Sequence, residues 1–118
     1  MTSPLWHDTL LQSPNSDLCA PVMVAEFISA KLNTARYYGR RNNPLLQEFY
    51  LKHALSTLLE AIADPLIALS IRKQCMDQLF KPLLALKRFY RLNHSSQQHF
   101  LRLQREACQV CQQFNPFI

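Results

Sequence analysis

The stretch from Pro44 to Ala63 reads PLLQEFYLKHALSTLLEAIA. Its apolar residues recur at steps of three and four, which is the spacing of one face of an α-helix. They are Leu45, Leu46, Phe49, Leu55, Leu58, Leu59 and Ile62. The pair Asn43-Pro44 marks the start, because Asn accepts a free backbone N–H of the first turn and proline has no N–H to leave unpaired. We therefore expect a helix over 44–63 that is the most buried helix of the protein.

The same signals place helices along the rest of the chain. Ser3-Pro4 and Asp64-Pro65 repeat the start made by a capping residue and a proline. The predicted helices span residues 4–12, 20–38, 65–81, 83–92 and 96–114. Gly39 is expected to end the helix before it. Pro82 is expected to kink or break the segment around it, because proline removes one backbone bond and clashes with the preceding turn.

These patterns together predict the fold class. No segment shows the alternation of a half-buried strand, and short connections between helices favour antiparallel neighbours. The prediction is an all-α protein, an antiparallel four-helix bundle with a short N-terminal helix and a Pro-kinked third helix. The 118 residues are enough for one domain with a substantial core. We expect a single domain over 1–118, with a short helix and loop in 1–19, the bundle in 20–114 and a tail in 115–118.

The composition excludes several classes of protein. The single glycine argues against glycine-rich phosphate loops. No apolar run approaches the ~18 residues of a membrane span. The start, MTSPLWHD, has neither the basic nor the apolar region of a secretory signal. The four cysteines, in a domain that needs no disulfide, indicate free thiols and a cytoplasmic location. They are Cys19, Cys75, Cys108 and Cys111.

Neither catalysis nor a bound metal is expected. The eight carboxylates are scattered, and no Glu-x-x-His pair of a di-iron bundle occurs. His53 falls near an apolar helix face and is interpreted as a core histidine. Cys108 and Cys111, with His94 and His99, are residue types that bind zinc, but their spacing is not that of a zinc finger. Cys111 falls on an apolar stripe, where a thiol packs as a small hydrophobic group. We therefore expect no enzyme, no cofactor and no metal.

Two short stretches combine basic and aromatic residues within a chain of net charge +5. Residues 36–41 read RYYGRR, and residues 87–91 read KRFYR. In an up-down-up-down bundle both stretches lie at the same end, where six cations form one surface for phosphate or another anion. These cations are Arg36, Arg40, Arg41, Lys87, Arg88 and Arg91. The alternative is that they only stabilise the C-terminal ends of their helices, whose negative dipole ends also repel phosphate.

Apolar residues nearly encircle the predicted helix over 83–92. A helix of ten residues cannot hide all of them against one neighbour, which indicates a surface for a partner protein or a homodimer. The expected docking residues are Leu83, Leu84, Leu86, Phe89 and Tyr90. The alternative is that the N-terminal helix and the C-terminal tail cover this helix within the same chain.

These features predict a non-catalytic protein-interaction module. Such a module is an adaptor, a regulator or an assembly chaperone that docks a partner, or a second copy of itself, through the apolar surface. The alternative is a small basic subunit that binds nucleic acid within a larger nucleoprotein complex. Its phosphate contacts would make binding sensitive to salt.

Overall fold

The computed structural model describes residues 16–93 and 97–114, with side chains from Val22 onward. Its helices are α2 (Ser16–Arg40), α3 (Pro44–Ala63), α4 (Leu69–Gln78), α5 (Phe80–Leu92) and α6 (Gln97–Gln113). The described residues contain no strand, which confirms the all-α class. None of these helices combines the length and the apolar character needed to cross a membrane. The helix predicted over 4–12 and the tail over 115–118 lie outside the described residues.

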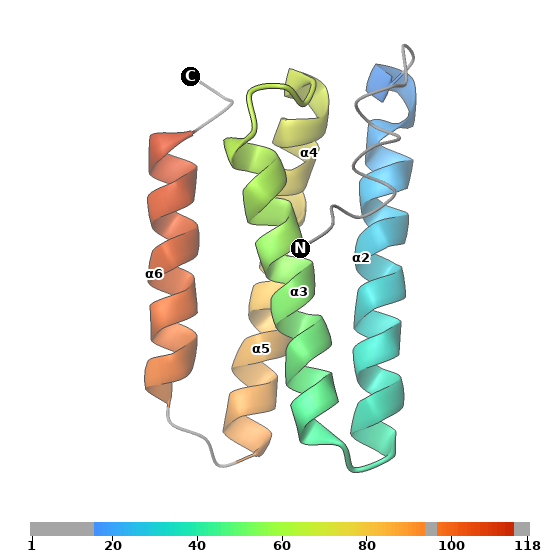
Figure 1. The fold of residues 1–118 in the computed structure, drawn as a ribbon, viewed down its shortest axis with the longest axis vertical. Coiled ribbons are helices and arrows are strands. Elements are labelled where there is room, and N and C mark those ends of the chain that lie inside the picture. The colour runs from blue at the N-terminus through green and yellow to red at the C-terminus, as the bar shows by residue number, and fades with distance from the viewer. Residues whose placement is uncertain (1–15, 94–96, 115–118) are drawn as a thin grey trace.

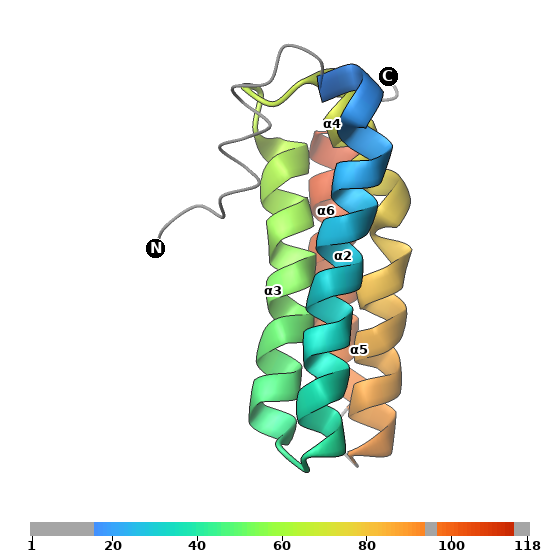
Figure 2. The same ribbon diagram turned by 90° about the vertical axis from the view of Figure 1, so that its right-hand side faces the viewer.

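The helices lie side by side along the long axis of the molecule (Figure 1). The chain runs along α2, turns back into α3, follows α4 and α5 in the direction of α2, and returns in α6. α2 and α6 lie on opposite sides of the pair formed by α3 and α4–α5 (Figure 2). α3 packs against all four other helices, whereas α6 packs mainly against α3 and α5. α3 is therefore the centre of the structure.

α3 supplies the largest share of the core, as its sequence predicts. Its buried residues are Leu51, Ala54, Leu55, Thr57, Leu58, Leu59, Ala61 and Ile62. The buried Thr57 hydroxyl donates a hydrogen bond to the His53 carbonyl oxygen at 2.7 Å, so burial leaves no unpaired hydroxyl. The first two turns differ from the prediction, because Leu45 and Phe49 are 79% and 55% exposed. No described helix covers that side of these turns.

The turn between α2 and α3 is built by asparagines rather than by the glycine. Gly39 lies inside α2 without a positive φ, so the prediction that it ends the helix is wrong. Asn42 takes the left-handed conformation, with φ of 56°, which asparagine tolerates better than most side chains. The backbone N–H of Asn43 donates to the Tyr38 carbonyl oxygen at 2.9 Å. The Asn43 side chain then accepts from the Leu46 N–H at 3.2 Å, which confirms the predicted cap of α3.

The helix that follows α3 begins later in the chain than predicted. It also ends before the predicted break at Pro82. The Asp64 side chain closes a turn by accepting from the Leu66 N–H at 2.9 Å, and α4 begins only at Leu69. α4 ends at Gln78, four residues before Pro82. The ring of a proline clashes with the carbonyl group four residues earlier, which accounts for this end. Pro82 is the third residue of α5, where a backbone N–H would have no partner within the helix.

Candidate anion-binding site

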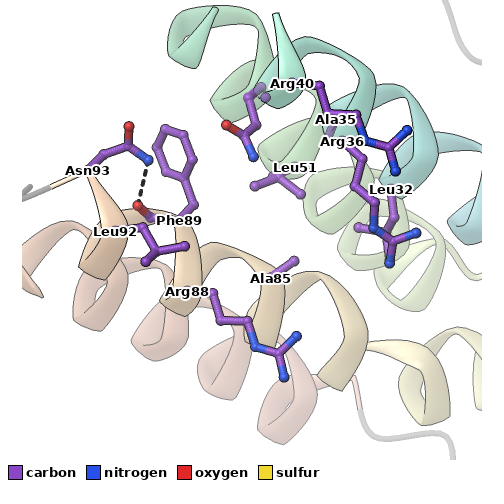
Figure 3. A pocket seen from close by; sticks show the side chains of 12 residues that line it. Leu32, Ala35, Arg36, Arg40, Leu51, Ala85, Arg88, Phe89, Leu92 and Asn93 are labelled. Carbon is purple, nitrogen blue, oxygen red and sulfur yellow. Dashed lines mark hydrogen bonds between the residues drawn. The ribbon is translucent and has the colours of Figure 1, made fainter. Parts of the chain in front are cut away.

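A pocket of about 460 Å³ lies between the C-terminal halves of α2 and α5, beside the start of α3 (Figure 3). Its lining residues are Leu32, Ala35, Arg36, Gly39, Arg40, Gln47, Leu51, Ala85, Arg88, Phe89, Leu92 and Asn93. This volume is within the range of sites for small ligands. Residues from both basic stretches of the sequence therefore border one pocket.

Three of the six predicted cations, Arg36, Arg40 and Arg88, line this pocket. Arg36 and Arg40 lie one turn apart on α2, and Arg88 lies across the pocket on α5 (Figure 3). All three are exposed, and none forms an ion pair with a carboxylate in residues 16–93 and 97–114. Arg36 Nη1 donates a hydrogen bond to Asn33 Oδ1 at 3.1 Å. Three positive charges without a described counter-charge give the pocket a positive potential.

The floor of the pocket is apolar. Ala35, Leu51 and Phe89 are 1%, 4% and 5% exposed, and Leu32 packs partly buried beside them. Apolar walls lower the local dielectric constant, which strengthens the attraction between a guanidinium group and an anion. The pocket therefore suits an anionic group that is attached to an apolar body.

Two neutral amide side chains, Gln47 and Asn93, complete the polar lining, and neither was predicted from the sequence. The Gln47 amide lies against Gly39, where an added Cβ would be 2.8 Å from Gln47 Nε2. The glycine thus provides space for this side chain at the contact between α2 and α3. Asn93 Nδ2 donates to the Phe89 carbonyl oxygen at 2.9 Å and so caps the end of α5. In the sequence, these two residues were marked only by following the basic stretches 36–41 and 87–91 within a few positions.

The other three predicted cations lie away from the pocket. The Arg41 guanidinium lies over the Tyr37 ring, 4.5 Å from its centroid. Lys87 lines a separate groove between α5 and α6, and Arg91 is exposed without lining either the pocket or the groove. The predicted six-cation surface therefore consists of one pocket with three arginines and three separate cations.

Helix ends of both polarities surround this end of the molecule. α2 and α5 end there, whereas α3 and α6 begin there (Figure 1). The positive dipole ends of α3 and α6 oppose the negative ends of α2 and α5. The dipole repulsion of an anion that the sequence suggested is therefore reduced.

The apolar residues predicted to dock a partner divide into a buried and an accessible set. Leu86, Phe89 and Tyr90 are 0%, 5% and 1% exposed, so the expectation that they form an exposed surface is wrong. α5 packs against α2, α3 and α6, and three neighbours hide more of the helix than one could. Leu83 is half-buried and Leu84 is 46% exposed, and both line the α5–α6 groove.

Two further exposed apolar residues, Phe80 and Leu101, line the α5–α6 groove of about 530 Å³. They are 60% and 51% exposed. Phe80 lies one helical turn before Leu84, and this spacing was a signal that the sequence analysis did not use. Lys87 is the only charged residue among those that line the groove. The groove remains the predicted docking place for a partner or a second copy of the chain.

A polar contact in the interior ties α5 to α3. The buried Tyr90 hydroxyl donates to Glu48 Oε2, and Lys52 Nζ lies 3.3 Å from the same oxygen. Burial raises the pKa of Glu48, but the hydrogen bonds from Tyr90 and Lys52 and the charges of Lys52 and His99 lower that pKa, and the net shift is downward. Burial and the bond to Glu48 raise the pKa of Tyr90 well above its ordinary value. Tyr90 therefore stays protonated and donates at neutral pH.

Tyr90→Phe is expected to lower the free energy of unfolding by about 1.5–3 kcal/mol at neutral pH, the range for a hydrogen bond to a charged group. Because the pKa of Glu48 is lowered by folding, its ionised form stabilises the protein fully above the ordinary pKa of 4.5. This stabilisation is lost as the pH falls through the lowered pKa. Urea unfolding measures the free energy of unfolding of wild type and variant at neutral and at acid pH. The difference between the two proteins should be smaller at acid pH. A difference independent of pH would contradict a role for ionised Glu48.

The cysteines form no metal site within the described residues. Burial raises the pKa of the Cys75 thiol to about 12, so it stays protonated. Cys108 is exposed and Cys111 is half-buried on α6. His94 lies outside the described residues. No group of three His, Cys, Asp or Glu side chains in residues 16–93 and 97–114 is placed to hold a metal ion.

His53 lies half-buried on α3, stacked on Phe49 with ring centroids 5.9 Å apart. Its Nδ1 atom is buried and has no hydrogen-bond partner among the described residues. Burial lowers the pKa of His53, and the charge of Lys31 lowers it further while that of Glu60 raises it. These surroundings favour a neutral histidine.

Comparisons with protein-family models, with curated proteins and with solved structures find no match.

Proposed function

We propose that this protein is a non-catalytic helical interaction module that binds an acidic, partly apolar segment of a partner protein. The anionic group of that segment would enter the pocket of Arg36, Arg40 and Arg88. The observation that supports this most is that arginines of two helices line one pocket without a described counter-charge. The planar donors of arginine match a carboxylate or a phosphate. The lining residues include no Ser, Cys, His, Asp or Glu, which favours binding over catalysis.

The apolar residues of the pocket favour a protein segment as the ligand. Leu51 and Phe89 form an apolar floor, and Leu92 is 73% exposed at the rim. An acidic side chain with apolar neighbours would place its charge among the arginines and its neighbours on these residues. Burying apolar surface would add to the affinity at about 25 cal/mol for each Å².

The proposed scaffold is an antiparallel four-helix bundle, in which α4 and α5 together form a third helix kinked near Pro82. A packed bundle would hold α2 and α5 at a fixed separation, so little ordering would accompany binding. The free thiols of Cys75, Cys108 and Cys111 support a reducing compartment such as the cytoplasm.

A labelled peptide of glutamate and leucine residues is the first probe, with a lysine and leucine peptide of equal length as its control. We expect fluorescence anisotropy to report binding of the acidic peptide only. This binding should weaken as salt is raised from about 50 to about 200 mM, because salt screens exposed charges. Equal binding of both peptides at low salt, or binding of the lysine peptide alone, would refute the proposed function.

Nucleic acid is the second candidate ligand, and Tyr37 with Arg41 favours it. Tyr37 is 49% exposed near the end of α2, and the Arg41 guanidinium lies over its ring. An exposed aromatic ring beside arginines can stack on a base while the arginines contact phosphates. The same titration with single-stranded and duplex oligonucleotides tests this candidate. Micromolar binding with a steep salt dependence, tighter than that of the peptide, would favour nucleic acid. No binding at low salt would exclude it.

A further inference from the structure

We infer that the anion bound by the basic pocket is a phosphate monoester on a side chain of the partner protein, such as phosphoserine or phosphothreonine. This inference rests on the proposed function and specifies the chemical group that the pocket recognises.

The number of donors in the pocket exceeds what a carboxylate can use. Each guanidinium carries five N–H donors, and one or two bidentate arginines occupy the two oxygens of a carboxylate. A phosphate monoester has three terminal oxygens and a charge of about −1.5 to −2 at neutral pH. Arg36, Arg40 and Arg88 bring three positive charges that no described carboxylate pairs with. A dianion balances these charges better than a carboxylate with one negative charge does.

The donors that line the pocket come from three different helices. Arg36 and Arg40 come from α2, and Arg88 comes from α5 across the pocket (Figure 3). Gln47, which also lines the pocket, comes from α3. The terminal oxygens of a phosphate point in three directions, whereas the oxygens of a carboxylate lie in one plane. The Gln47 amide adds a neutral donor beside the three charged ones.

Three cations of the two basic stretches line one pocket, and the other cations of these stretches do not extend it into a continuous row. Arg41 lies over the Tyr37 ring, and Lys87 lines the α5–α6 groove. A nucleic-acid backbone carries closely spaced phosphates and would engage a longer track of cations. One dianionic group on a segment with apolar neighbours matches the three arginines and the apolar floor of Leu51 and Phe89.

Three peptides that differ at one position test this inference. That position holds serine, glutamate or phosphoserine, and leucines flank it. We expect calorimetric titration to give the phosphoserine peptide an affinity about tenfold or more above that of the glutamate peptide, with no binding of the serine peptide. Arg88→Glu should abolish the preference. Arg102→Glu, an equal charge change at an exposed site of α6, should preserve it.

Each alternative outcome has a distinct meaning. Equal affinity for the glutamate and phosphoserine peptides would overturn the phosphate inference and leave the proposed function standing. Binding of neither peptide would overturn both. Inorganic phosphate should compete with the phosphoserine peptide, and failure to compete would contradict a shared pocket. Tighter binding to phosphatidate vesicles than to the phosphoserine peptide would assign the phosphate to a lipid headgroup and overturn the inference.

Discussion

Phe89→Asp is expected to abolish the folded state, whereas Leu84→Asp is expected to leave the protein folded. The sequence predicts that both residues belong to one exposed surface, but Phe89 is 5% exposed and Leu84 is 46% exposed. An aspartate at position 89 would place a charged carboxylate among the apolar residues of the core. It would also remove the Phe89 ring, which packs against the Tyr90 ring with 5.3 Å between the two ring centroids. Such losses amount to several kcal/mol, against a total stability of about 5–15 kcal/mol for a small domain.

Thermal melting followed by circular dichroism measures this difference. Leu84→Asp should melt within a few degrees of the wild type, because exposed substitutions change stability by about 0.5 kcal/mol. Phe89→Asp should show no cooperative transition. Phe89→Leu is the matched control, since it keeps an apolar side chain and should retain a transition at a lower temperature. A wild-type-like melt of Phe89→Asp would contradict the burial of this face of α5.

The double substitution Arg36→Glu with Arg88→Glu is expected to weaken binding of an anionic peptide by about 100-fold or more. A hydrogen bond to a charged group contributes about 1.5–3 kcal/mol, and each 1.4 kcal/mol is a tenfold change in affinity. The two new carboxylates would also repel the anion. Both arginines are exposed, so the helical circular dichroism signal and the melting temperature should change little.

Arg102→Glu with Arg105→Glu is the matched control for this charge reversal. Both control residues are exposed on α6 and lie outside the pocket, and the change in net charge is the same. We expect this control to weaken binding only a few-fold, through the overall charge of the protein. Equal losses in the two double variants would show that net charge, and not the pocket, attracts the anion.

The helices that could be predicted are those whose signals are local. α3 begins at Pro44 and ends at Ala63 as predicted, because the cap and the apolar spacing act over one helical turn. The helix predicted over 96–114 is observed as Gln97–Gln113, and its apolar spacing is likewise a local signal. Asp64 shows the limit of such signals, because an aspartate side chain can cap a helix or close a turn. Here it closes a turn, and α4 begins five residues later.

The features that could not be predicted depend on contacts between distant segments. Leu86 and Tyr90 are buried because α2, α3 and α6 all pack against α5, and no local pattern reports the number of neighbours. The Tyr90 bond to Glu48 joins residues 42 positions apart. Exposed aromatic residues are likewise indistinguishable from core residues by spacing, as Phe49 illustrates.

The basic stretches were visible in the sequence, but their division between two surfaces was not. Successive residues of a helix point about 100° apart, so the rotation of each helix decides which surface a side chain joins. Arg88 lines the pocket with α2, whereas Lys87, one residue earlier, lines the groove with α6. This rotation is set by the packing of α5 against its neighbours.

A double-mutant cycle on Arg36 and Arg88 tests most directly that the two basic stretches serve one site. The affinity for the phosphoserine peptide is measured for wild type, Arg36→Ala, Arg88→Ala and the double variant. We expect each single substitution to weaken binding. The loss of binding free energy in the double variant should differ from the sum of the losses in the two single variants. We expect a difference of about 0.5 kcal/mol or more, because both arginines contact the same anion. Unchanged binding by Arg88→Ala, or losses that add within about 0.3 kcal/mol as for independent sites, would contradict a shared pocket.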